Sequence, residues 1–306
     1  MVVHDGDILR RFVFDHFPVR GYLVRLDASW RALIEHHSYP EVIRSPLGEA
    51  VAATTLLAAT VKFDGRLTLQ VQGPGPMHLL VVQATPGLAV RGVARWRGEL
   101  PLAPLSVAAL SGGGQMTVTV ESEDHSNRYQ GIVPLQGETL AQCFEAYFSQ
   151  SEQLPTRLWL ASTGERAAGL LLQRLPSGAS GSAAEIEHSA AEGDEDWNRV
   201  AQLAATLSDA ELIELPADEL LHRLFHEEDI RVFEPAPVYF QCTCSRDRVN
   251  GILRSLGEPE VRDILKERGD VEVRCEFCNR AWQYDAVDVG ALFAAADPLG
   301  GPRAVQ

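Results

Sequence analysis

Four of the five cysteines lie in two short motifs, Cys242-Thr243-Cys244 and Cys275-Glu276-Phe277-Cys278, which are separated by thirty residues. Thiolates at these spacings can converge on one tetrahedral Zn²⁺, because each motif supplies two sulfur ligands from one stretch of backbone. Four cysteines leave no open coordination position, so we expect one structural Zn²⁺ per chain. The two motifs therefore predict a small zinc-binding domain at residues 237–306.

Two different roles for these cysteines agree less well with the rest of the chain. Unrelated core cysteines would rarely pair at both spacings, and permanent disulfides are typical of short secreted proteins. The start of the chain, Met1–Asp7, holds acidic residues and no basic region, so it does not resemble a signal peptide. No apolar run is long enough to span a membrane. We therefore expect a cytoplasmic protein with reduced thiols and no membrane partner.

The negative charge of the chain is concentrated in one segment. The net charge is −15 and the sequence pI is near 5.0. Between Glu185 and Glu234 there are fifteen acidic residues and only three arginines. Such a chain repels phosphate backbones, which argues against a nucleic-acid partner. Apolar residues recur there with helical spacing, so we expect an acidic helical linker at residues 179–236, whose docking is weakened by self-repulsion.

Residues 1–178 are predicted to form an α+β domain, with a mixed, mostly antiparallel sheet and packed helices. The clearest strand is Arg66–Gln72, where apolar and polar residues alternate before a Gly-Pro turn and a return strand. The small residues after Pro46 predict a helix that begins at this proline and packs closely against a sheet. A flexible joint of Ser, Gly and Ala at residues 176–182 closes the domain.

Two further groups of residues are candidate sites. Cys143 lies among aromatic residues of a predicted helix, so a core position is favoured over a catalytic nucleophile. His222 and His226 are four residues apart and could bind a metal with Glu219, but a solvated helix face is the favoured interpretation. No Gly-x-Ser-x-Gly motif is present. We assign no catalytic residues and do not expect an enzyme.

The cysteine spacing also suggests a redox switch. Thiolates react with peroxide and hypochlorous acid, and a sulfenic acid formed on one cysteine can be attacked by a neighbour. Cys242/Cys244 and Cys275/Cys278 are the obvious partners. A disulfide is not a thiolate ligand, so oxidation would remove the metal on which a domain of this size depends for folding. The linker would then be released and apolar surface exposed. Most zinc sites with four cysteine ligands are only structural, so spacing alone leaves this question open.

The whole chain resembles the Hsp33 family of redox-regulated heat-shock chaperones. The resemblance rests on the two cysteine motifs and on stretches of the first domain: Gly48–Ala50, Leu67–Gln70, Gln72–Pro76, Tyr129–Leu135 and Tyr147–Thr156. It implies a cytoplasmic, ATP-independent holdase that is inactive when reduced and zinc-bound. It also implies that oxidation forms the disulfides Cys242–Cys244 and Cys275–Cys278, removes zinc, unfolds the linker and yields a homodimer that binds unfolded client proteins.

Two alternative functions remain. A zinc-ribbon module with a purely structural zinc would present the arginines near the cysteines to nucleic acid, although these arginines are expected to pair with nearby acids. A thiol oxidoreductase would use Cys275 and Cys278 at a helix N-terminus in a βαβ context. A predicted strand precedes this motif and an aromatic, strand-like segment follows it, which disfavours the second alternative.

Overall fold

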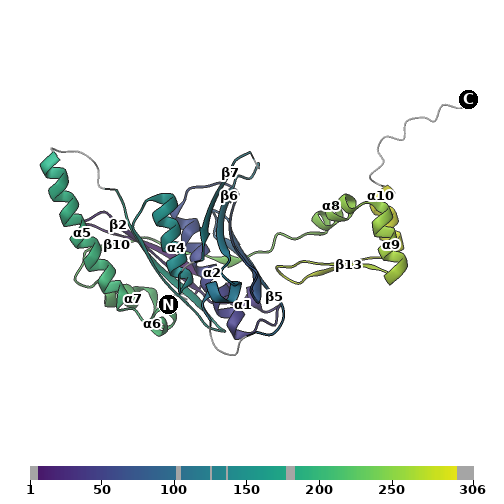
Figure 1. Ribbon diagram of the computed structural model, residues 1–306, viewed down its shortest axis with the longest axis horizontal. Helices are drawn as coiled ribbons and strands as arrows, with labels where there is room; N and C mark the ends of the chain where they lie inside the picture. The colour runs from purple at the N-terminus through teal and green to yellow at the C-terminus, as the bar shows by residue number, and fades with distance from the viewer. Residues whose placement is uncertain (1–5, 101–104, 125, 136, 177–182, 295–306) are drawn as a thin grey trace, which may run out of the picture. The chain divides into compact units, whose positions relative to one another are not determined.

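The computed structural model describes residues 6–100, 105–124, 126–135, 137–176 and 183–294. The chain divides into two compact units, Met1–Gln241 and Cys242–Gln306. The first unit is built from two sheets with packed helices, and the second is a small α+β unit that carries the cysteine motifs (Figure 1). The α+β fold class is therefore confirmed. The three-part division at residues 178 and 236 stays a prediction. Among the described helices, none combines the length and apolar character that a membrane span requires.

Sheet A forms one layer of the first unit and is antiparallel throughout. Its strand order is β10-β1-β2-β9-β8, and β11 also pairs with β1. Strands β2 and β9 are buried along most of their length, because both faces of the sheet are covered. The strands are β1 (Ile8–Phe14), β2 (Val19–Leu26), β8 (Thr156–Ser162), β9 (Ala167–Arg174), β10 (Ile230–Val232) and β11 (Ala236–Pro237).

Sheet B has the order β12-β5-β4-β3-β6-β7 and is antiparallel except where β12 joins β5. Burial alternates along β3, so one face of the sheet meets the core and the other meets solvent. The predicted hairpin around the Gly-Pro turn is confirmed by the β3–β4 pairing. The strands are β3 (Arg66–Gln72), β4 (Met77–Ala84), β5 (Ala89–Trp96), β6 (Gln115–Glu121), β7 (Arg128–Pro134) and β12 (Tyr239–Phe240).

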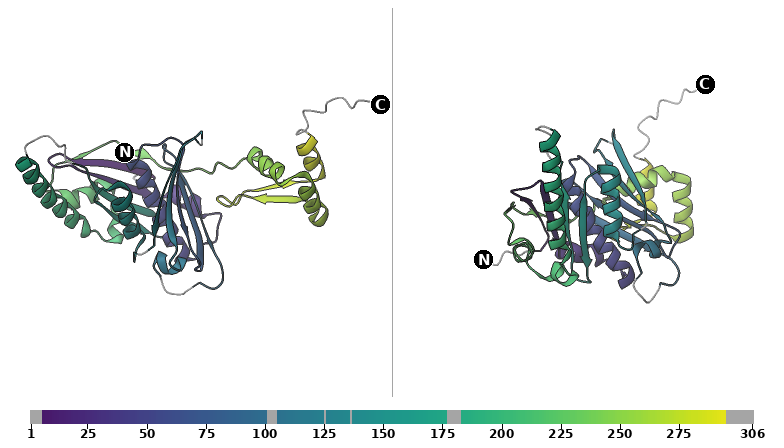
Figure 2. Two further views of the ribbon diagram at one scale, coloured as in Figure 1. Left: turned by 45° about the horizontal axis from the view of Figure 1, so that its top comes forward. Right: turned by 60° about the vertical axis from the view of Figure 1, so that its left-hand side comes forward.

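Helix α2 (Glu41–Thr60) lies between the two sheets and contacts both (Figure 2). Its run of small residues, Ala50–Ala53, is fully buried, which lets two sheets approach one helix closely. The predicted start at Pro46 is wrong. Pro40 occupies the N-cap, and Pro46 lies inside the helix, where burial of its neighbours offsets the missing N–H. The other helices of this core are α1 (Ala28–Ile34), α3 (Val107–Ser111), α4 (Leu140–Tyr147) and the π-helical turn η1 (Phe148–Glu152).

The acidic segment forms three helices that pack on the outer face of sheet A (Figure 1). These are α5 (Ala183–Ala205), α6 (Asp209–Glu214) and α7 (Ala217–Phe225). Ser208 and Glu211 form the expected capping box at the start of α6. The predicted joint at residues 176–182 lies mostly outside the described residues. The apolar residues of these helices pack on sheet A and so hold the like-charged helices together on one face of the sheet.

The second unit is held by a small apolar core. It contains α8 (Arg246–Leu256), α9 (Glu258–Arg268), the hairpin β13 (Val271–Arg274) and β14 (Ala281–Tyr284), and α10 (Ala286–Ala294). Tyr284 is fully buried and donates its hydroxyl to Asn250 Oδ1 at 2.8 Å. So small a core is marginal without a metal or another cross-link. The buried apolar residues are Val249, Leu253, Val261, Val271, Tyr284, Val289 and Leu292.

Candidate metal centre

The first cysteine pair is positioned by the start of helix α8. Cys242 and Cys244 lie in the extended segment directly before Ser245, which is the N-cap of α8 and accepts the backbone N–H of Arg248 at 3.2 Å. The guanidinium of Arg248 also donates to Thr243 Oγ1 at 2.7 Å. The segment is thereby tied to the first turn of the helix, whose unpaired N–H groups favour negative charge nearby.

The second pair lies in the turn between β13 and β14. The carbonyl of Cys275 accepts the N–H of Asn279 at 2.8 Å, and the N–H of Cys275 donates to the carbonyl of Arg280 at 2.9 Å. Asn279 has φ 54°, a left-handed conformation that asparagine tolerates better than most residues. The turn therefore directs the sulfurs of Cys275 and Cys278 to one side of the hairpin.

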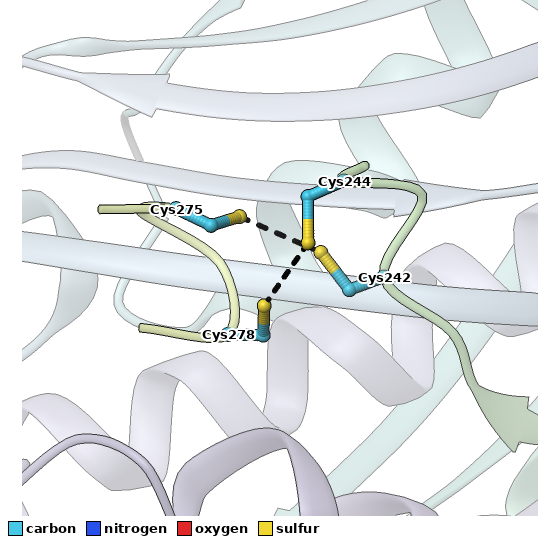
Figure 3. A group of neighbouring side chains, drawn as sticks. All are labelled: Cys242, Cys244, Cys275 and Cys278. Carbon is cyan, nitrogen blue, oxygen red and sulfur yellow. Dashed lines mark hydrogen bonds between the residues drawn. The ribbon is translucent and has the colours of Figure 1, made fainter. Parts of the chain in front are cut away.

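The four sulfurs meet in one cluster (Figure 3). All four Sγ atoms lie within 4.8 Å of one another. The shortest contacts run between the motifs, at 3.5 Å for Cys242–Cys275 and 3.4 Å for Cys244–Cys278. A tetrahedral site with Zn–S of ~2.3 Å separates its sulfurs by about 3.8 Å. The donor set and its spacing therefore fit a metal site with four cysteine ligands.

The protonation of the cluster also favours a cation at its centre. Burial acts to raise the pKa of Cys242, but hydrogen bonds from the backbone and thiol of Cys244 and from the other two thiols lower it to about 7. Burial and the neighbouring sulfurs raise the pKa of Cys244, and burial raises that of Cys278. One thiolate is thus accommodated easily and further thiolates are not. A bound dication would supply the charge that further ionisation needs.

The other candidate residues do not gather into a metal site. Cys143, a residue of α4, is buried in the core, as expected. The rings of His222 and His226 stack at 5.8 Å on the exposed face of α7. Among the residues that the structure describes, the four clustered cysteines are the one group of potential ligands. The favoured interpretation of the histidines as a solvated face agrees with this placement.

A set of arginines on sheet A was missed from the sequence, and it holds the acidic helices. Arg10 of β1 pairs with Asp218 of α7 at 2.7 Å, and Arg174 of β9 pairs with Asp194 of α5. At α6 the guanidinium of Arg25, buried in β2, donates to the carbonyl of Ile213 at 2.7 Å. The signal that could have identified these residues is the presence of arginines in three mostly apolar strands: Arg10 and Arg11 in β1, Arg20 and Arg25 in β2, and Arg174 at the end of β9.

Known proteins resemble this chain along nearly its whole length. The family described as "Hsp33 protein" matches residues 7–285. The chain belongs to the Hsp33 family.

Individual relatives agree with this family assignment. A 33 kDa chaperonin of Nitrosococcus oceani is 48% identical over 95% of this chain and 96% of that protein. One from Methylobacillus flagellatus is 44% identical over 97% of each. The crystal structure of an Hsp33 homologue from Thermotoga maritima matches with a TM-score of 0.80 at 24% identity, over 95% of this chain and 99% of that one, and so shows the shared fold. The predicted family is therefore confirmed, and its members are named as chaperonins rather than as enzymes.

The surroundings of the cysteines bear on the two alternative functions. Cys275 and Cys278 lie in a hairpin turn rather than at a helix N-terminus, so the setting of a thioredoxin-like motif is lacking in the described second unit. Arginines of this unit pair with acids, as Arg246 does with Asp288 at 3.0 Å and Arg262 with Glu258 at 2.7 Å. Both observations weaken the alternatives.

Proposed function

We propose that this chain is a redox-regulated, ATP-independent holdase chaperone, which binds unfolding proteins under oxidative stress without transforming them. The single observation that carries the proposal is the convergence of four cysteine sulfurs within 4.8 Å in a unit with a small core. Membership of a family of chaperonins supports the holding activity. We further propose a cytoplasmic location, where these thiols would stay reduced until the stress arises.

In the reduced state, Cys242, Cys244, Cys275 and Cys278 would hold one Zn²⁺ as thiolates. The bound ion would supply folding free energy to the unit that contains Val249, Leu253 and Tyr284. The family resemblance and the fit of the four sulfurs support zinc as the metal. In this state the chaperone would be inactive.

Oxidation would convert these ligands into two disulfides. Hydrogen peroxide transfers one oxygen atom to a thiolate, which becomes a sulfenic acid, and its second oxygen atom leaves as hydroxide. The thiol of another cysteine then attacks the sulfenic acid, so that the S–S bond forms and water leaves. Family resemblance points to Cys242–Cys244 and Cys275–Cys278 as the products. The shortest sulfur contacts instead join Cys242 to Cys275 and Cys244 to Cys278, yet all pairs lie within 4.8 Å. Either pairing would leave no thiolate to hold the ion.

Loss of the metal would then uncover a binding surface on sheet A. Helix α7 places Leu220, Leu224 and Phe225 against the apolar face formed by Phe12 and Phe14 of β1. If the acidic linker at residues 179–236 comes loose, this face becomes a contiguous apolar patch of the kind that marks a protein-binding site. We propose that domain 1–178 then binds clients and forms the homodimer.

The direct test is suppression of aggregation of a thermally unfolding client, with zinc counted by a chromogenic chelator. Reduced protein should give little protection, and protein treated with peroxide at elevated temperature should protect and release about one zinc per chain. The variant Cys143→Ser is the matched control, since its sulfur lies in the core and not in the cluster. Equal protection by reduced and oxidised protein would contradict the switch. Peptide mapping of the oxidised protein would show which cysteines are joined.

A further inference from the structure

Strand β7 is a long edge of sheet B, and no described strand pairs with its outer side. Figure 1 shows β7 beside β6 at the rim of the sheet. An edge strand offers unpaired N–H and C=O groups to any extended chain that approaches it, and proteins normally protect such edges. The absence of protection here calls for a physical explanation.

Flanking hydrogen bonds show which backbone groups of β7 face outward. The N–H of Leu135 donates to Gly114 O at 3.0 Å, and the N–H of Ser122 donates to Asn127 O at 3.0 Å. Residues of an antiparallel ladder alternate between pairs that exchange both bonds and pairs that exchange none. The odd-numbered residues of β7 therefore pair with β6. The N–H and C=O groups of Arg128, Gln130 and Ile132 point away from it, and so does the C=O of Pro134, which has no N–H.

The comparable edge of sheet A is protected. The N–H of Arg174 donates to the carbonyl of Pro155, so the odd-numbered residues of β8 exchange hydrogen bonds with β9. The N–H of Leu158 in β8 therefore points away from β9. The carboxylate of Glu145 accepts that N–H at 2.9 Å and pairs with Arg157 at 2.8 Å. The opposite edges end in the short strands β10 and β12. Within the described part of the first unit, β7 is thus the long edge that lacks a side-chain cover.

Apolar side chains flank the outer groups of β7 on both faces of the sheet. Tyr129 is 49% exposed and Ile132 is 56% exposed. Side chains alternate between the two faces along a strand, so these two residues, three positions apart, lie on opposite faces of sheet B. Gly131 has no side chain, which leaves room for the buried ring of Tyr147 against the core face of the strand. The edge is therefore held firmly from behind and presents apolar contacts beside its free backbone groups.

We propose that β7 binds an extended segment of a non-native polypeptide by adding it to sheet B as a further strand. This inference rests on the proposed holdase function and names a binding surface for it. Backbone pairing does not depend on the sequence of the segment, which suits clients of unrelated sequence. Three outward N–H groups and four outward C=O groups give few hydrogen bonds, so the edge binds weakly alone and acts together with the apolar face of sheet A.

A second copy of the chain is a poorer occupant of this edge. Antiparallel pairing of two β7 strands about Gln130 would place Arg128 opposite Ile132, which makes no cross-strand ion pair. An unfolded client segment can pair with β7 in several registers, so no particular residue must lie opposite Arg128.

The test measures the affinity of the oxidised full-length protein for reduced, carboxymethylated α-lactalbumin, a permanently unfolded chain. Gln130→Pro removes an outward N–H and leaves the ladder to β6 intact, so we expect about tenfold weaker binding. Gln130→Ala keeps the N–H and should bind within about twofold of the parent. Ile132→Lys should weaken binding at least threefold. Its control is Ile252→Lys, at a residue of α8 that is 58% exposed, and it should leave affinity unchanged.

Hydrogen exchange locates the contact independently of the variants. Bound α-lactalbumin should slow exchange at the outward amides of Arg128, Gln130 and Ile132, and leave the inward amides as they were. Binding by the parent protein without this protection, and with unchanged affinity in Gln130→Pro and Ile132→Lys, would overturn the edge proposal and leave the holdase function standing. A parent that fails to bind when oxidised would overturn both. Loss of a homodimer in Gln130→Pro at unchanged client affinity would assign the edge to a second copy and overturn the proposal.

Discussion

The rings of Phe14 and Phe225 meet edge to face, with centroids 5.2 Å apart and an interplanar angle of 83°. Phe14 belongs to β1, near the start of the chain, and Phe225 ends the last acidic helix. Phe12 also contacts Phe225, at 5.9 Å, and lies 5.9 Å from Phe14. The ring of Phe225 is therefore one of the side chains that fasten the acidic segment to the apolar face of sheet A.

Truncation of this aromatic side chain should loosen the linker. Phe225→Ala removes a fully buried ring, which costs roughly 3 to 5 kcal/mol where the site cannot collapse. We expect faster hydrogen exchange in α6 and α7, and protection of clients at lower peroxide concentration. Phe63→Ala, which truncates a half-buried ring packed against the other core, should leave exchange in α7 unchanged. Unaltered exchange in Phe225→Ala would show that this contact does not hold the linker.

Replacement of Arg25 should release α6 more than replacement of Arg10 releases α7. Arg25 is 8% exposed and donates to Ile213 O, so Arg25→Met leaves that carbonyl without this bond and should cost about 1 to 3 kcal/mol of local stability. Arg10→Met loses an ion pair with the exposed Asp218, worth about 0.2 to 1 kcal/mol. Hydrogen exchange of the α6 and α7 amides gives both values. An equal loss of local stability in Arg25→Met and Arg10→Met would contradict the prediction that Arg25 contributes more.

Glu49 should make the first unit less stable as pH rises. Burial, with a smaller contribution from the charge of Asp209 in α6, raises the pKa of Glu49 to about 7, although a hydrogen bond from Ser45 acts to lower it. Below about pH 4.5 the carboxyl is neutral folded or unfolded, and no penalty applies. Between pH 4.5 and pH 7 the carboxyl of Glu49 is ionised in the unfolded chain but still neutral in the folded chain, so the free energy of unfolding falls as the pH rises. Above pH 7 the penalty levels off at about 3 kcal/mol.

The isosteric variant Glu49→Gln tests this effect. It should raise the free energy of unfolding most at pH 8 and little at pH 4.5, as followed by urea denaturation. Glu41→Gln, at an exposed residue on the first turn of the same helix, is the control and should show no such pH dependence. Equal stabilisation of Glu49→Gln at both pH values would mean that the Glu49 carboxyl is not held neutral.

Removal of the metal should melt the second unit and leave the core of the first unit folded. Its small core and clustered thiols predict loss of the β13–β14 hairpin amide protection after chelation of the reduced protein, with sheet B unchanged. Gly251→Ala should partly resist this melting. A Cβ at this position in α8 meets no atom within 4 Å, and alanine favours a helix by about 1 kcal/mol over glycine. Retained hairpin protection in the metal-free parent would contradict the dependence on metal.

Sequence reasoning succeeded where the evidence was local. The cysteine motifs predicted a cluster, Ser208 and Glu211 predicted a helix start, and alternation along β3 predicted a hairpin with β4. It failed at Pro46, because a proline is tolerated inside a buried helix when tertiary packing offsets the lost hydrogen bond. It also missed Arg10, Arg25 and Arg174, since their partners lie far along the chain in the acidic helices.

The sequence by itself determined the four cysteines of the cluster, the family and the acidic character of the helices, because each depends on residue types at short spacing. Tertiary structure alone decided that Phe225 meets Phe12 and Phe14, that Arg25 holds α6, and that β7 keeps an open edge. These features depend on strand order and register. Both are set by the packing of segments that are distant in sequence, so no local pattern records them.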